Sequence, residues 1–102
     1  MTLHDICQEV TEVEEGLIYG QISFNYDNLM SAMKPGHPAD LLDDIIQEVG
    51  WDALEGKPVE LSRVKDWVKD LKRFKAAFKV KELSLPIKHA TEYIKEQESL
   101  LR

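Results

Sequence analysis

Cysteine, long apolar runs and N-terminal basic residues are all scarce in this chain of 102 residues. Cys7 is the only cysteine, so no internal disulfide can form, and a secreted fold held by disulfides is not expected. No apolar run approaches the roughly 20 residues that a helix needs to cross a bilayer. The first residues include Asp5 and Glu9 and do not resemble a signal peptide. We therefore expect a cytoplasmic protein without a membrane segment.

Basic side chains are almost missing from the first 60 residues, where Lys34 and Lys57 stand against thirteen acidic residues. This part carries a net charge of −11, the remainder carries +5, and the whole chain carries −6. A modestly acidic chain is not drawn as a whole to nucleic acid or to anionic membranes. The unusual feature is therefore the separation of the two charges along the chain.

The sequence also lacks the patterns that accompany catalysis or metal binding. His4 and Cys7 are three residues apart and could offer two ligands from a helix, but no second pair completes a zinc site. His37 and His89 have no evident nucleophile beside them, and no glycine-rich phosphate loop or calcium loop occurs. We predict a non-catalytic protein with no metal and no cofactor.

A long amphipathic helix over residues 58–82 is the strongest positive pattern. Its apolar side chains recur at steps of three and four residues, which places them on one face: Leu61, Val64, Trp67, Val68, Leu71, Phe74 and Phe78. The remaining positions are mostly basic: Arg63, Lys65, Lys69, Lys72, Arg73, Lys75, Lys79 and Lys81. Trp67 lies in the apolar stripe and is expected to anchor the core.

Further helices are predicted at 2–15, 17–34, 40–50 and 85–101. Thr2 with Asp5 forms a capping-box pattern at the first start. Gly16 and Gly50 are the expected stops of two helices, Asp40 is the expected cap of the third, and Pro58 suits the first turn of the long helix. Trp51 and Leu54 are expected to form a short turn that folds back onto the core.

Residues 17–34 are ambiguous between helix and strand. As a helix they form one long stripe, made of Ile18, Ile22, Tyr26, Leu29 and Met33. As a strand, residues 22–26 alternate apolar and polar side chains. The helical stripe is longer and no partner strand is evident, so we predict a helix. Leu17 and Phe24 then fall on a second face, where they must contact another helix or a partner.

The predicted fold is therefore all-α, with residues 1–102 forming a single-domain bundle of four to five helices. Residues 5–10 and 44–49 match except for Cys7 against Ile46, which suggests a duplicated helical hairpin. The alternative is chance agreement between two acidic amphipathic helices. A stacked array of repeats usually needs three or more copies, so a bundle is the preferred architecture.

Two explanations fit the basic helix. Its charges can face the acidic half of its own bundle, or they can bind a partner. For nucleic acid, the expected signal is a basic stripe with aromatic side chains offered to bases. Here the aromatic residues fall on the apolar face, and the acidic half would repel phosphates. Nucleic-acid binding by the basic face of the 58–81 helix is thus the alternative function.

The preferred function is a protein-interaction module, acting as an adaptor, regulator or inhibitor of a larger protein. One variant is that the acidic half imitates nucleic acid on a basic target. The chain could also associate with copies of itself. The expected partner-binding residues combine surplus apolar groups with charges of both signs: Leu17, Phe24, Asp43, Asp44, Glu48, Trp51, Lys65, Lys69 and Arg73.

Overall fold

The structure is a computed structural model, and it describes residues 2–23 and 38–101. The described residues form helices and turns, with no strand among them. The elements are α1 (Leu3–Ile18), α3 (Pro38–Leu54), α4 (Leu61–Phe78), the 3₁₀ helix η1 (Lys81–Leu83) and α5 (Ser84–Leu100). These helices confirm the predicted all-α fold and its helix number.

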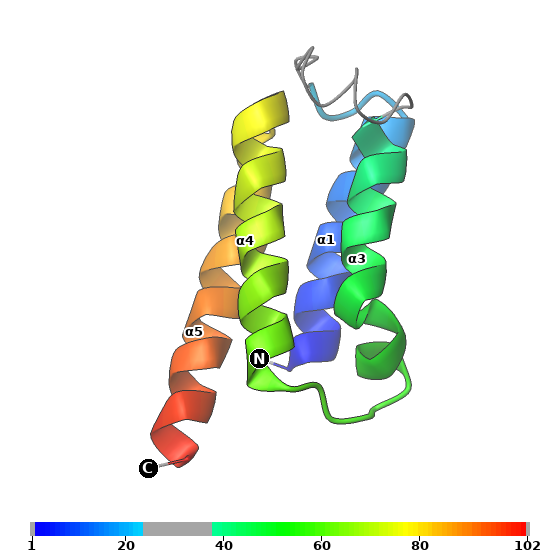
Figure 1. Cartoon of the computed structure of the whole chain (residues 1–102). Helices are drawn as coiled ribbons and strands as arrows, with labels where there is room; N and C mark the ends of the chain where they lie inside the picture. The colour runs from blue at the N-terminus through cyan, green and yellow to red at the C-terminus, as the bar shows by residue number, and fades with distance from the viewer. Residues whose placement is uncertain (1, 24–37, 102) are drawn as a thin grey trace.

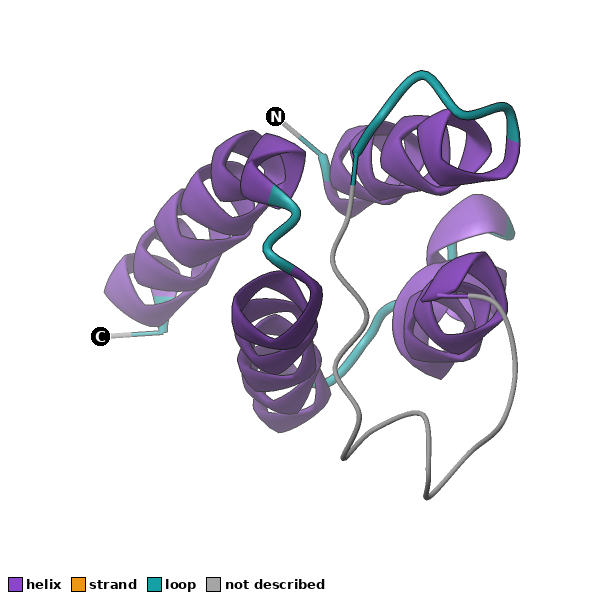
Figure 2. Ribbon diagram, turned by 90° about the horizontal axis from the view of Figure 1, so that it is seen from above, coloured by secondary structure: helices purple, strands orange, loops and turns teal. Residues whose placement is uncertain are grey.

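The helices run alternately up and down and form a ring (Figures 1 and 2). α1 packs against α3 and α5, and α4 packs against the same two helices from the other side. A short connection joins α3 to α4, and η1 lies between α4 and α5. This is the arrangement of an up-and-down helical bundle, in which neighbours in sequence are neighbours in space.

The apolar stripe of α4 provides the largest side chains of the core. Trp67, Phe74 and Phe78 have no exposed surface, and the rings of Phe74 and Phe78 lie 4.8 Å apart. No charged or polar residue is buried among the described residues. The prediction that Trp67 belongs to the core is confirmed. Its indole Nε1 has no hydrogen-bond partner among the described residues.

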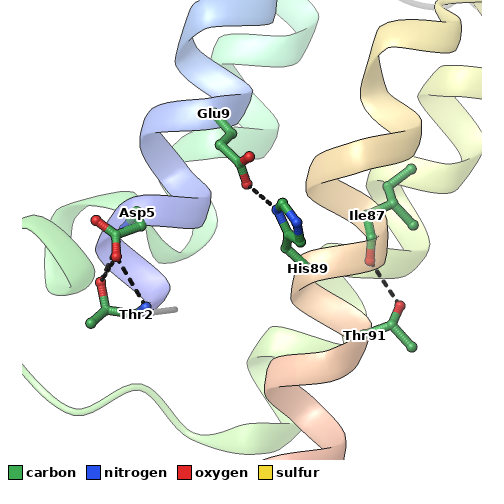
Figure 3. Close-up of polar contacts among 6 residues, drawn as sticks. All are labelled: Thr2, Asp5, Glu9, Ile87, His89 and Thr91. Carbon is green, nitrogen blue, oxygen red and sulfur yellow. Dashed lines mark hydrogen bonds and ion pairs between the residues drawn. The ribbon is translucent and has the colours of Figure 1, made fainter.

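The start of α1 follows the predicted capping box (Figure 3). The amide of Asp5 donates to Thr2 Oγ1 at 3.2 Å, and the amide of Thr2 donates to Asp5 Oδ2 at 3.2 Å. The backbone hydrogen bond from Thr2 lowers the pKa of Asp5, because it stabilises the carboxylate. The cap fixes the first turn of α1.

The predicted stop at Gly16 is wrong, because α1 continues to Ile18. Tyr19 is the C-cap, and Gly20 after it has a φ of +75°, a left-handed conformation that glycine adopts without steric cost. The chain then folds back, and the amides of Gln21 and Ile22 donate to the carbonyl of Gly16. A Cβ at Gly16 would lie 2.5 Å from Ile22 Cδ1, so this glycine provides close packing rather than a stop.

The helix predicted over 17–34 is also wrong at its beginning. Leu17 belongs to α1 and is buried in the core with 2% exposed, so it is not available to a partner. Residues 19–23 form turns and bends, neither helix nor strand. Phe24 and the rest of this segment lie outside the described residues, so that part of the prediction stays untested.

α3 extends beyond both predicted ends. It begins at Pro38, which takes the first helical position that its fixed φ favours, so Asp40 lies within the first turn and is not the cap. It also runs through Gly50, since a helical glycine costs only about 1 kcal/mol relative to alanine. The true stop is Gly56, with φ +72°.

Trp51 and Leu54 consequently form the last turn of α3 rather than a separate turn folded onto the core. Trp51 is 65% exposed and Leu54 is 58% exposed. The turn is closed by two backbone bonds, from the amide of Lys57 to the carbonyl of Asp52 and from Gly56 to Ala53. This Schellman-type ending satisfies helix carbonyls without covering the two apolar side chains.

α4 is shorter than the predicted 58–82 helix. It begins at Leu61, so Pro58 precedes the helix instead of starting it. It ends where Lys79 adopts φ 56° and the amide of Val80 donates to the carbonyl of Lys75. Lys79 is strained in this conformation because it is not a glycine, and Val80 directly after it is buried in the core.

α5 agrees with its predicted range to within one residue at each end. Its first turns pack onto the core, where Ile87 and Ala90 are buried. At the other end of the helix, Leu100 is 77% exposed and Leu101 is 79% exposed. Figure 1 shows why, because the last turns of α5 extend past the other helices.

Truncation of Trp67 tests this description of the core. Trp67→Ala should lower the free energy of unfolding by about 3–5 kcal/mol, because it leaves a large cavity. Trp67→Phe should cost clearly less, because it keeps a ring and removes an unpaired buried N–H that itself costs about 1–3 kcal/mol. Urea denaturation measures both variants. Equal losses for the two would contradict this description of the core, because the ring that Phe retains would then contribute nothing to stability.

Candidate interaction groove between α1 and α3

A groove lies on the outer surface between α1 and α3. It consists of two adjoining hollows of about 430 and 230 Å³, which share Thr11, Ile46, Gly50 and Leu54 as lining residues. Trp51 lines the smaller hollow. The largest exposed aromatic side chain of the described residues therefore stands at the edge of a concave surface.

The floor of the groove comes from one stripe of α3. Ile46, Gly50 and Leu54 follow at four-residue steps, which places them on one helix face. Gly50 contributes no side chain, and a Cβ there would lie 3.2 Å from Ile46 Cγ2. Because Gly50 has no side chain, the surface is concave between Ile46 and Leu54.

The rim of the groove is acidic on both sides. Its carboxylates are Glu12, Glu14 and Glu15 from α1 and Asp43 from α3. No Lys, Arg or His side chain is among the described residues that line the two hollows. The rim therefore carries charge of one sign.

Glu14 shows the effect of this crowding. Partial burial, followed by the charges of Asp43, Glu15 and Asp40, raises the pKa of Glu14 from 4.5 to about 7. Asp43 in turn accepts a hydrogen bond from Gln47 Nε2 at 2.8 Å. At neutral pH the Glu14 carboxyl thus holds a proton for part of the time, since burial and then neighbouring negative charge oppose its ionisation.

Among the described residues predicted to bind a partner, Trp51 and Asp43 are the two that line the groove. Asp44 is exposed on α3 but does not line the groove. Glu48 lies near α4, beside Asp66 and Asp70. The predicted acidic surface of residues 43, 44 and 48 is therefore divided, because α3 turns these positions toward different neighbours.

Between α3 and α4, like charges meet instead of opposite ones. Partial burial, a hydrogen bond with Asp70 and the charges of Asp70 and Asp66 raise the pKa of Glu48 to about 7. Among the described residues of these two helices, Arg63 provides the expected contact of opposite charges, with Nη1 2.8 Å from Asp52 Oδ2. The hypothesis that the basic helix faces the acidic half of its own bundle is thus supported, between α3 and α4, by the contact of Arg63 with Asp52.

The basic face of α4 points outward. Lys65, Lys69 and Arg73 are exposed, and Lys65 Nζ pairs with Glu98 Oε1 of α5 at 2.7 Å. Trp67 and Phe74 are fully buried on the opposite side. This face offers cations to a ligand but no aromatic ring on which a base could stack.

His89 has a partner that the sequence did not reveal. Its Nδ1 lies 2.7 Å from Glu9 Oε1, and this contact joins α5 to α1 across 80 positions (Figure 3). Both side chains are 22% exposed. No local spacing could predict this pair, because it depends on how the two helices pack.

The His4–Cys7 pair does not form part of a larger ligand cluster. Cys7 is 2% exposed, and burial raises the pKa of its thiol to about 11. The thiol therefore stays protonated at neutral pH and packs as a small apolar side chain. Within residues 2–23 and 38–101, no group of three metal-ligating side chains occurs.

Comparison with protein-family models, curated protein sequences and solved structures finds no match for this chain. No helix of the described ranges combines the length and apolar character needed to cross a membrane. The groove therefore has to be interpreted from its own geometry and charge.

The raised pKa of Glu14 predicts how stability depends on pH. The folded protein binds this proton more tightly than the unfolded chain, so stability falls as pH rises from about 4.5 to about 7. Glu14→Gln should remove this loss and raise the free energy of unfolding by about 0.5–1 kcal/mol at about pH 8, after allowance for solvent screening.

The same variant should have little effect near pH 4.5, where Glu14 is protonated in the folded state. Chemical denaturation across this pH range measures the difference. Glu92→Gln on the exposed side of α5 is the matched control and should show no such trend. A Glu14→Gln variant that gains nothing at high pH would contradict the proposed crowding of carboxylates.

Proposed function

We propose that this chain is a small non-catalytic protein-interaction module of the cytoplasm, acting as an adaptor, regulator or inhibitor of a larger protein. The observation that supports it is the exposure of Trp51 and Leu54 beside the α1–α3 groove. Large aromatic side chains are enriched at the energetic centres of protein interfaces. An exposed tryptophan at the edge of an apolar hollow is well suited to anchor a partner.

The separation of charge supports the same proposal. The rim of the groove is acidic, whereas the outer face of α4 is basic. A polarised charge distribution steers a charged partner toward one face and fixes its orientation, even where it adds little affinity. The single cysteine and its burial agree with a reducing compartment, which supports the cytoplasmic assignment.

Nucleic-acid binding by α4 is the second candidate function. The exposure of Lys65, Lys69 and Arg73 favours it, because these side chains could contact successive phosphates. The burial of the α4 aromatic rings and the negative net charge oppose it. The two functions use different faces of the bundle, so they can be tested separately.

The first test is capture of a partner from the cells that naturally make the chain, identified by mass spectrometry. Trp51→Ser should abolish capture, because it removes the anchor, while circular dichroism shows an unchanged fold. Leu85→Ser, an exposed apolar position on α5, is the control and should leave capture intact. Undiminished capture by Trp51→Ser would contradict the proposal.

The second test is binding to an arbitrary DNA duplex at low salt. We expect no retention of duplex, since the net charge of the chain is negative. If the second function is correct, affinity should be measurable and fall steeply with salt, because bound cations are released from the phosphates. Replacing Lys65, Lys69 and Arg73 with Gln should then abolish it. A salt-sensitive complex that needs these three residues would reverse our ranking.

A further inference from the structure

We infer that the α1–α3 groove binds a basic amphipathic helix, with apolar side chains on the floor and Lys or Arg side chains against the acidic rim. This inference rests on the proposed function and names the class of partner. It follows from the shape of the groove, its apolar floor and the sign of its rim.

The shape of the groove fits a helix. The lining residues of α1 extend from Cys7 to Glu15, a distance of about 12 Å along a helix, or about two turns. α1 and α3 run side by side in opposite directions (Figures 1 and 2), and residues of both helices line the two hollows. An amphipathic helix placed between such walls presents anchors at steps of three and four residues.

The floor provides complementary contacts for those anchors. Ile46 and Leu54 are apolar, and Gly50 between them allows an incoming side chain to approach the helix backbone. Trp51 lies beside this stripe and would cover the docked helix from one side. Ile46 is only 8% exposed, so a partner with leucine-sized side chains would remove from water mainly the exposed apolar surface of Leu54 and Trp51.

The rim selects for positive charge. Carboxylates stand on both sides of the floor, and none of the described lining residues can neutralise them. Partial burial and, after it, the neighbouring charges of Asp43, Glu15 and Asp40 raise the pKa of Glu14, so this rim carboxylate gains from a positive charge nearby. Lys or Arg side chains along the flanks of a docked helix would replace this repulsion with attraction, whereas an acidic helix or a nucleic acid would increase it.

The described helices of a second folded copy do not supply such a helix. Its basic amphipathic helix is α4, but the apolar face of α4 is fully used in the core, with Trp67 and Phe74 at 0% exposure. Its exposed face is basic and lacks large apolar side chains. The occupant is therefore a basic amphipathic segment of another protein.

The experiment titrates the whole protein with a model peptide of about 18 Leu and Lys residues, long enough to be helical when bound. Tryptophan fluorescence reports binding, because the exposed Trp51 becomes covered while Trp67 is already buried. Trp67→Phe provides a background in which Trp51 is the only tryptophan. We expect a saturable shift of emission to shorter wavelength, with one peptide bound per chain.

Two control peptides separate the contributions. A scrambled peptide of the same composition keeps the charge but has no apolar face, and a Leu/Glu peptide keeps the apolar face but reverses the charge. Both should bind at least about tenfold more weakly, since each lacks one of the two complementary features. Equal binding of the scrambled peptide, or of the Leu/Glu peptide, would overturn the inference.

Variants of the groove locate the site. Glu14→Gln with Asp43→Asn should weaken Leu/Lys binding about tenfold at low salt, since both carboxylates lie on the rim. Glu92→Gln with Glu96→Gln removes the same charge from the exposed side of α5 and should leave binding unchanged. Equal effects of the two double variants would show general attraction to an acidic protein, and the inference would fail.

Two further outcomes distinguish this inference from the proposed function. If a natural partner is captured through Trp51 while the Leu/Lys peptide does not bind, the interaction module stands and the basic helix as its occupant fails. If the chain forms dimers that bury Trp51, a second copy occupies the groove, and the inference is again overturned. Gel filtration of the protein alone, with Trp51→Ser as the comparison, measures this association.

Discussion

Burial of the apolar stripe of α4 is the constraint on which the rest of the bundle depends. Trp67 and Phe74 are completely enclosed, so α4 cannot rotate without losing several kcal/mol of apolar burial. Its orientation in turn decides where its charges lie. Lys69 and Arg73 point to solvent, whereas Asp66 and Asp70 are directed toward Glu48 of α3. Between α3 and α4, the free energy of apolar packing is therefore larger than that of charge pairing, as expected when each exposed ion pair contributes at most about 1 kcal/mol.

Because apolar burial contributes more free energy than charge pairing, neighbouring carboxylates are tolerated at two contacts between helices, α1 with α3 and α3 with α4. Glu48 beside Asp70 and Glu14 beside Asp43 each oppose ionisation at neutral pH. The pair of His89 and Glu9 joins α1 to α5, away from both of these contacts, and does not relieve this repulsion. A protein tolerates such local costs when its core provides enough stability, and unfavourable local arrangements are typical of functional surfaces. Among the described residues, Glu14 shares a hollow with the apolar side chains of Ile46 and Leu54, whereas the hollow beside Glu48 is lined by charged residues.

The sequence predicted the helices well because their apolar stripes are regular, but it predicted their ends poorly. A stop depends on which residue takes a left-handed conformation, and here these are Gly20, Gly56 and Lys79. Gly16 and Gly50 look like equivalent stop signals in the sequence, but both remain helical, because a glycine inside a helix costs only about 1 kcal/mol. Trp51 and Asp43 could be selected as candidate site residues from residue type alone. Glu14 could not, because its place in the groove depends on how α1 is aligned with α3.

The two candidate binding surfaces differ in how much of their charge is available. On α4, Lys65 already pairs with Glu98 and Arg63 with Asp52, so intramolecular contacts occupy part of the basic surface. A phosphate ligand would have to compete with these carboxylates, which reduces the gain from counterion release. In the α1–α3 groove, by contrast, none of the described lining residues is a cation that could occupy the rim. A cationic partner there would displace water and a partly bound proton rather than an existing ion pair. The acidic groove is therefore the surface on which a ligand of opposite charge gains most.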